Sequence, residues 1–106
     1  MAESRMIEVA EELLRRSKEG DLSWERAIRD SYSIEFPDIS LVIFRPGHDE
    51  YLLSLRDLGG DVIESFYAEP GVAAFKTLEE IYDIARRQAL DVEGNIDKAL
   101  GYLKKQ

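Results

Sequence analysis

Apolar residues recur every three or four positions near the start of the chain and every second position in its middle. Over residues 3–18 this spacing predicts an amphipathic helix, which ends near Gly20. The apolar positions of this helix are Met6, Ile7, Val9, Ala10, Leu13 and Leu14. Residues 20–30 follow neither period, and we expect an irregular or extended segment in which Trp24 covers an edge of the core.

Four segments in the middle of the chain have the period of two that is typical of half-buried strands. The predicted strands cover residues 31–36, 40–45, 51–56 and 62–67. In the first of them Tyr32, Ile34 and Phe36 share one face. Pro, Gly and Asp residues mark short turns between the segments, so the strands are expected to form an antiparallel meander in chain order.

Helical spacing returns after a linker over residues 68–75. Thr77 is followed three residues later by Glu80, which predicts a capping box and a helix that begins at Thr77. The apolar face of this helix consists of Leu78, Ile81, Tyr82, Ala85 and Ala89. A break near residues 91–94 precedes a short last helix, whose apolar residues are Ile96, Ala99, Leu100 and Leu103.

The order of predicted elements is α-β-β-β-β-α-α in a single domain over residues 1–106. A sheet with one apolar face needs a cover, and three amphipathic helices can supply it. The sequence therefore predicts a two-layer α+β fold. Its four-stranded antiparallel meander sheet is covered on one face by the N-terminal helix and the two C-terminal helices.

The other face of the sheet is expected to be mixed in character. If Tyr51 and Leu53 point inward, the residues next to them along the strand point away from the helices. In the second predicted strand, one of two pairs must also point away from the helices, either Leu41 and Ile43 or Val42 and Phe44. The pattern leaves that choice open, and exposed apolar patches often mark interfaces. The candidate interface residues are Val42, Phe44, Leu52, Ser54, Arg56 and Glu64 on the sheet, with Arg86 and Arg87 on the following helix.

The chain has 22 acidic and 14 basic residues, a net charge of −8 with its one histidine neutral. Most of the surplus lies in residues 21–70, which hold eleven acids and four bases. Such a field repels nucleic-acid phosphates and anionic lipid headgroups. We therefore expect a protein partner or a second copy of the chain, and neither nucleic acid nor membrane.

The chain has no cysteine, which excludes disulfides, thiolate catalysis and cysteine-ligated zinc. Its longest apolar runs have four residues, against about 20 for a membrane-spanning helix. The charged N-terminal stretch lacks the apolar segment of a secretory signal. A cytoplasmic location is expected.

Residues 81–103 have the helix–break–helix pattern of some DNA-reading motifs. Their arginine pair, Arg86 and Arg87, lies on the first helix, however. The start of the second helix carries Asp91 and Glu93, which would repel phosphates. The pattern favours two packing helices.

His48 lies with Arg45, Asp49 and Glu50 in a turn that follows the second strand. Adjacent turn residues usually diverge, and no second histidine is present to complete a metal site. The chain also lacks the nucleophile elbow of serine hydrolases. The sequence predicts no catalytic, cofactor or metal residues, although a small hydrolase around His48 remains an alternative.

Three stretches carry structural motifs: LLRRSKEGDLSWE (13–25) with its G-x-L-x-W entry, YLLSLRDLGGDVIESF (51–66), and LEEIYDIARRQALDVEGNIDKAL (78–100). Together they resemble a type of small bacterial α+β domain of unknown function, which closes with an LYELARRxAL-like helix. The resemblance implies a self-standing α+β module and no particular activity. The hairpin from Pro37 to Asp49 has no counterpart in it.

These observations favour a non-enzymatic protein-interaction or regulatory module. It is expected to self-associate as a homodimer through the exposed sheet face. Alternatively, it could bind a partner through its helical C-terminal part, residues 71–106, in which acidic and basic residues balance. One alternative is an acidic inhibitor that mimics nucleic acid, of the anti-restriction or anti-defence type, because of the acids in residues 21–70. The other alternative is the small hydrolase at His48.

Overall fold

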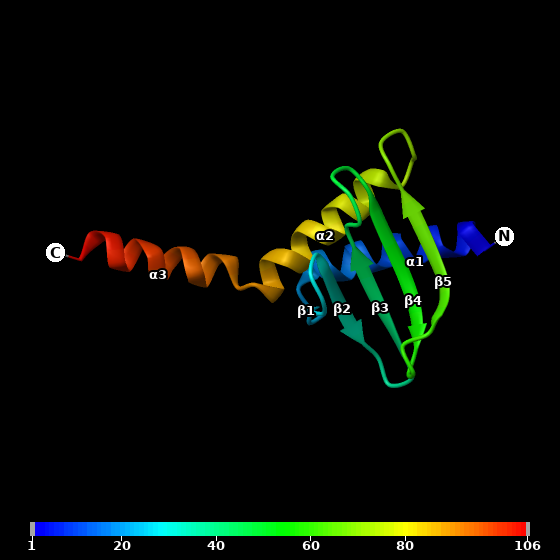
Figure 1. The fold of residues 1–106 in the computed structure, drawn as a ribbon, viewed down its shortest axis with the longest axis horizontal. Coiled ribbons are helices and arrows are strands. Elements are labelled where there is room, and N and C mark those ends of the chain that lie inside the picture. The colour runs from blue at the N-terminus through cyan, green and yellow to red at the C-terminus, as the bar shows by residue number, and fades with distance from the viewer. Residues whose placement is uncertain (1, 106) are drawn as a thin grey trace.

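The computed structural model describes residues 2–105. Within them a long helix is followed by five strands and two further helices (Figure 1). The elements are α1 (Ala2–Glu19), β1 (Glu25–Arg26), β2 (Ser31–Glu35), β3 (Ile39–Phe44), β4 (Tyr51–Asp57), β5 (Val62–Ala68), α2 (Phe75–Ala89) and α3 (Val92–Lys104). The predicted α+β class is confirmed, with one strand more than predicted.

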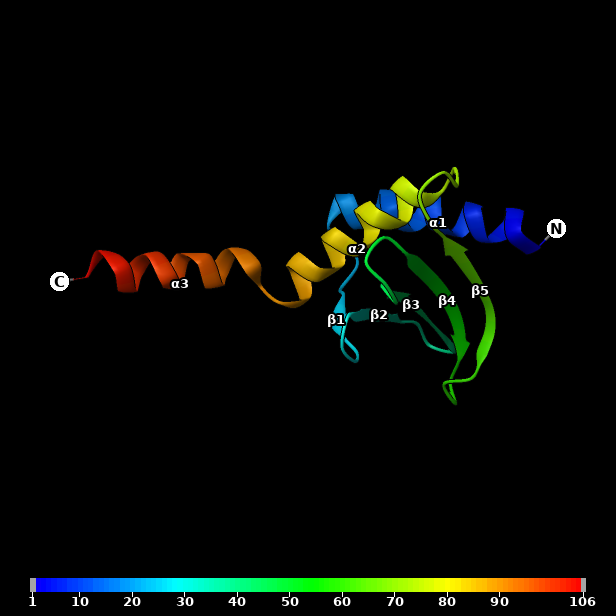
Figure 2. The ribbon, with the colours of Figure 1, turned by 45° about the horizontal axis from the view of Figure 1, so that its top comes forward.

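The strands form one antiparallel sheet in chain order, β1-β2-β3-β4-β5, as the short turns predicted. In the additional strand, β1, Glu25 pairs with Ser33 and Arg26 with Tyr32. Two residues are too few to show an alternation of apolar and polar side chains, so the sequence pattern could not reveal this strand. Helices α1 and α2 lie on the same face of the sheet (Figure 2).

The core lies between this helix pair and the sheet. Ile43 and Leu53 of the sheet and Leu78 and Ile81 of α2 are completely buried. Burial of each such side chain stabilises the fold by about 1.5–3 kcal/mol. Every second residue of β2 and β4, and every third or fourth residue of α1 and α2, reaches this layer, which is why the two periods in the sequence predicted the elements correctly.

The inward face of β3, which the sequence left open, carries Leu41 and Ile43. Ile43 pairs with Leu53 across β3 and β4, and directly paired residues lie on the same side of a sheet. Val42 and Phe44 therefore belong to the outer face. The choice depends on the register of the neighbouring strands, because both alternating sets of β3 are apolar.

Trp24 anchors the segment that leads from α1 into β1. Its indole Nε1–H donates a hydrogen bond of 3.0 Å to Oγ of buried Ser17 on α1, and its backbone N–H donates to Oε1 of Gln88 on α2. Only 4% of the residue is exposed. The predicted role of Trp24 at an edge of the core is confirmed.

Helix α2 begins at Phe75, two residues before the predicted start at Thr77. The N-cap is Ala74, which makes no side-chain capping bond, so the predicted capping box does not form. Burial of Ala74 and packing of the Phe75 ring, 5.6 Å from that of Tyr51, favour the additional helical residues. The carboxylate of Glu80 lies 3.4 Å from Nζ of Lys18 and so links α2 to α1.

Helix α3 does not cover the sheet, which corrects the place predicted for it. It points away from the rest of the molecule (Figures 1 and 2), and none of its described residues is buried. The chain turns at Asp91, which has a left-handed backbone with φ 50° and ψ 54°. The Asp91 carboxylate accepts a hydrogen bond from the Gly94 N–H and caps α3. The molecule is consequently elongated, with extents of 60 × 34 × 25 Å.

Within the described chain, no helix combines the length and the apolar character that crossing a membrane requires.

Candidate interaction surfaces

The outer sheet face is the side of the sheet turned away from α1 and α2. It carries five of the predicted interface residues, which are Val42, Phe44, Leu52, Ser54 and Arg56. Val42 and Ser54 lie directly opposite each other on β3 and β4 and are only 7% and 2% exposed, because larger neighbours flank them. They therefore form the floor of this face and offer little contact area themselves.

The contact area of the outer sheet face comes from a row of three larger side chains. Phe44 pairs with Leu52, and Leu52 pairs with Tyr67 of β5. Phe44 and Leu52 are half-buried, whereas Tyr67 is 45% exposed. Tyr67 was not among the predicted residues, although alternation from an inward Phe66 would have placed it here.

Glu64 lies on the helix-covered side of β5, away from the five residues of the outer sheet face. It pairs with Leu55, whose side chain packs against the core. A register shift at Leu55 and Arg56 changes the alternation, since Arg56 pairs with Val62 and Ile63 is skipped. This β-bulge lies beyond Glu64 and leaves only Ile63 without a partner. Alternation from the inward Phe66 therefore places Glu64 on the helix-covered side, as it places Tyr67 on the outer one.

Arg56 lines a hollow of about 230 Å³ in the outer sheet face, with Ser33, Glu35, Ser40 and Asp57 among its neighbours. Its Nε is buried and has no hydrogen-bond partner. Among the described side chains of residues 5–105, no carboxylate forms a salt bridge with Arg56. The buried Nε is not accessible to another molecule, but the terminal Nη atoms of a guanidinium can donate two parallel hydrogen bonds to a carboxylate.

Arg86 and Arg87 belong to α2 and are separated from the outer sheet face by the core. Arg87 contacts the carboxylate of Glu93 at the start of α3. Arg86 lines a polar hollow with Arg45, Tyr82 and Asp83. The structure thus does not join these two arginines to the predicted interface residues of the sheet.

The same polar hollow exposes one edge of a cluster of aromatic rings. The ring centroids of Tyr32 and Tyr82 are 5.5 Å apart and those of Tyr51 and Tyr82 are 5.4 Å apart. Burial raises the pKa of the Tyr51 and Tyr82 hydroxyls above the ordinary value of 10.0. Both phenols are therefore neutral at physiological pH, and their geometry is that of core packing.

The turn that carries His48 is organised by Arg45. The Arg45 guanidinium donates hydrogen bonds from Nη2 and Nε to the His48 carbonyl oxygen, at 2.7 and 3.2 Å. The His48 side chain is exposed. Among the side chains that the structure describes, those of residues 5–105, no group of three or more histidines or carboxylates is arranged to hold a metal ion.

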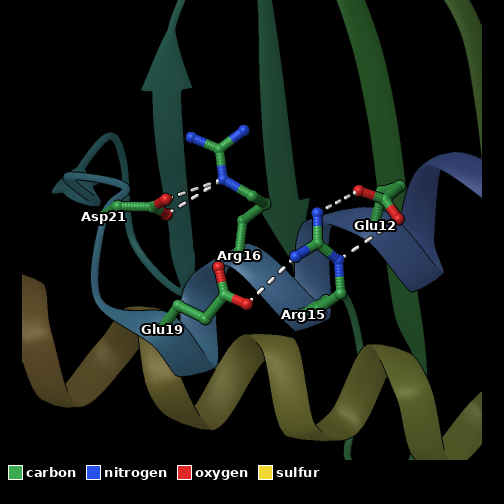
Figure 3. A network of polar contacts seen from close by, with 5 residues as sticks. All are labelled: Glu12, Arg15, Arg16, Glu19 and Asp21. Atoms are coloured by element: carbon green, nitrogen blue, oxygen red, sulfur yellow. Dashed lines mark hydrogen bonds and ion pairs between the residues drawn. The ribbon is translucent and has the colours of Figure 1, made fainter.

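Exposed ion pairs line α1 (Figure 3). Arg15 contacts Glu12 at 2.7 Å and Glu19 at 3.0 Å, and its hydrogen bonds lower the pKa of the Glu12 carboxyl. Arg16 binds both carboxylate oxygens of Asp21 and so orders the turn after the helix. Exposed pairs of this kind contribute about 0–1 kcal/mol each, so they shape the surface more than they stabilise it.

Three of the four large, exposed apolar side chains of α3 gather on one side of the helix, whereas Tyr102, which is 79% exposed, lies about 100° around the helix from Leu103. Ile96 is 46% exposed, Leu100 44% and Leu103 75%. At 3.6 residues per turn, Val92 and Ala99 lie on the same side, which gives an apolar stripe about 100° wide. We call these five residues the α3 stripe. Its width matches that of a helix face that normally packs against a core.

Comparison with protein families finds no match, and neither curated proteins nor solved structures match the chain. The resemblance to a bacterial domain type therefore stays a prediction, and the surfaces themselves carry the functional argument.

Proposed function

We propose that this chain is a non-enzymatic protein-interaction module. The observation that carries this proposal is the α3 stripe, an apolar helix face that no other part of the described chain covers. An isolated helix of 13 residues is marginal in water, and α3 also contains Gly94 and Gly101, each less favourable than alanine by about 1 kcal/mol. A protein partner that covers the stripe supplies the missing stabilisation.

The outer sheet face is the second candidate surface. Its Phe44–Leu52–Tyr67 row offers apolar contact, and Arg56 beside it forms no salt bridge with the described side chains of residues 5–105. These features suit a partner segment that places an apolar side chain on the row and a carboxylate on Arg56. This surface is independent of α3, because it lies on the sheet.

The acidic-mimic alternative has less support from the geometry. The acids of residues 21–70 are concentrated in the turns at both ends of the sheet, for example Asp38 and Asp61 at one end and Asp49 at the other. A mimic of a phosphate backbone needs carboxylates in a row along one surface. The hydrolase alternative has less support too, because the His48 imidazole is exposed and joins no catalytic cluster.

A photo-crosslinking amino acid in place of Leu100 tests the proposed function in cells that produce the chain. We expect a discrete covalent adduct, either of two copies or of this chain with another protein. The matched control is the same amino acid in place of Lys98, which lies on the opposite side of α3 and should give much less adduct. If the crosslinker gave the same amount of adduct at Leu100 and Lys98, or none at either position, α3 would not be an interaction surface.

The outer sheet face is tested in the same way with the crosslinker at Tyr67. The control position is the exposed Glu69, just beyond the end of β5. An adduct at Tyr67 that disappears in an Arg56→Ala background supports recognition of a carboxylate-bearing partner. An adduct that is indifferent to Arg56 contradicts that recognition.

A further inference from the structure

The charges of α3 are divided between its two halves. Residues 91–97 contain Asp91, Glu93 and Asp97 and no base, whereas residues 98–105 contain Lys98, Lys104 and Lys105 and no acid. Two parallel copies would place like charges together, while two antiparallel copies place each acidic half beside a basic half. The helix dipoles also favour the antiparallel arrangement.

We propose that the partner of the α3 stripe is α3 of a second copy of this chain, packed antiparallel to the first. This inference rests on the proposed function, and it adds the identity of the partner and the geometry of the contact. Glu93 and Lys104, which flank the stripe near opposite ends of the helix, make α3 complementary to itself in this orientation, which gives a closed, two-fold symmetric dimer.

The apolar residues of α3 support the same arrangement. Val92, Ile96, Ala99 and Leu103 are spaced by four, three and four residues, which is the heptad spacing of a coiled-coil seam. With the two-fold axis level with Asp97 and Lys98, Val92 meets Leu103 of the second copy, and Ile96 meets its Ala99. The larger side chain of each pair thus faces the smaller one, as efficient packing of a narrow seam requires.

The flanks of the stripe are complementary in the same register. Glu93 and Lys104 lie on the same flank, and antiparallel pairing brings Lys104 of one copy near Glu93 of the other. Glu93 also contacts Arg87 of its own chain, so a cationic cluster surrounds this carboxylate. Leu103 arrives at the α2–α3 junction of the second copy, where a shallow hollow is lined by Ile84, Arg87 and Gln88.

The dimer places the two sheets at opposite ends of the paired helices. Because the α3 stripe is separate from the outer sheet face, the Phe44–Leu52–Tyr67 row of each copy stays accessible. One molecule then presents two identical outer sheet faces to further partners, which increases the avidity for a repeated target.

The first experiment is a measurement of solution mass by sedimentation over a wide range of concentration. We expect the natural chain to dimerise and Ile96→Glu to weaken dimerisation by roughly a hundredfold, because an apolar seam disfavours a buried carboxylate. Near-ultraviolet circular dichroism of Trp24 checks that the variant keeps its core. The matched control is Ile63→Glu, the same change at an exposed site on β5, which should dimerise like the natural chain.

The second experiment tests the orientation, and it uses the absence of natural cysteine in the chain. Single-cysteine variants Val92→Cys and Leu103→Cys are oxidised separately and as a mixture. Antiparallel pairing predicts a disulfide between the two different variants in the mixture and little disulfide within either one. Parallel pairing would instead link each variant to itself and would overturn the proposed geometry.

The outcomes separate this inference from the proposed function. A natural chain that remains monomeric, together with a crosslink from Leu100 to a different protein, would overturn the inference and leave the function standing. A monomer without any crosslink would overturn both. A dimer that Ile63→Glu disrupts and Ile96→Glu does not would move self-association to the sheet and contradict the inference.

Discussion

At the scale of single residues, a few buried polar contacts position the surfaces. Ser17 is 6% exposed on α1, and its hydroxyl accepts the indole hydrogen of Trp24. This bond connects the first helix to the start of the sheet, and Gln88 connects the same residue to α2. The direction in which the chain enters β1 therefore depends on Trp24, for which the sequence predicted only a place at an edge of the core.

Replacement of Ser17 by alanine should destabilise the fold by about 1–3 kcal/mol, because the buried indole N–H of Trp24 loses its acceptor. Urea unfolding followed by Trp24 fluorescence measures the change. Ser23→Ala, at an exposed neighbouring position, is the matched control and should have a free energy of unfolding close to that of the natural chain. Equal stability of the two variants would contradict a structural role for the Ser17–Trp24 bond.

The buried tyrosines predict sensitivity to alkaline pH. Burial raises the folded-state pKa of Tyr51 and Tyr82, so folding favours the neutral phenols. Their contribution is complete below the unfolded pKa near 10.0 and is lost as the pH rises through the raised values. The free energy of unfolding should therefore fall above pH 10.0, and tyrosine absorbance should titrate together with unfolding.

Tyr82→Phe removes one of these groups and should reduce the alkaline loss of stability while leaving the core packed at neutral pH. The comparison is made by urea unfolding at neutral and alkaline pH. The same pH dependence in the variant as in the natural chain would show that Tyr82 does not contribute.

At the scale of elements, the two faces of the sheet have different energetic roles. On β4, Leu53 is completely buried under the helices, whereas its neighbour Leu52 lies half-buried on the outer sheet face. The two leucines are chemically identical, so a difference in the stability lost when each is replaced depends only on the face of the sheet that it occupies.

Leu53→Ala should reduce the free energy of unfolding by about 2–5 kcal/mol, because it opens a cavity in the core. Leu52→Ala, the matched control, should cost about 1 kcal/mol or less. Urea unfolding of the monomeric state measures both. A larger loss for Leu52 would reverse the faces assigned to β4 and would remove the outer sheet face as a binding surface.

At the scale of the whole molecule, the described chain consists of a packed α+β body and a projecting helix. The buried apolar residues all precede α3, and the last of them is Ala85. The body thus needs nothing from α3 for its own core, whereas α3 needs a partner for its apolar stripe.

A chain that ends after Asp91 should therefore fold cooperatively and remain monomeric. Its urea midpoint should match that of the Ile96→Glu variant, because both keep the complete core. A chain that ends after Ala73 loses Leu78, Ile81 and Ala85 and should not fold. Failure of the longer truncation to fold would show that α3 stabilises the body directly.

Periodicity along the chain predicted the long helices, the longer strands and most inward residues. This works because the residues that face the core recur every 3.6 positions in a helix and every two positions in a strand. The α+β class and the antiparallel meander followed from these periods and from the short turns. Of the predicted interface residues, Val42, Phe44, Leu52, Ser54 and Arg56 share the outer sheet face, whereas Glu64, Arg86 and Arg87 do not join them. Binding by any of these residues stays a prediction.

Tertiary structure decided the features that depend on a neighbour. The two-residue β1 exists only through its pairing with β2, the face of β3 follows from its register with β4, and the bulge beside Arg56 pairs that residue with Val62 and leaves Ile63 without a partner. The place of α3 is the clearest case. The apolar stripe of α3 predicts that one side of the helix is covered. The left-handed turn at Asp91, however, directs the helix away from the sheet of its own chain. A pattern along one sequence specifies which residues are buried; only the arrangement in space specifies what buries them.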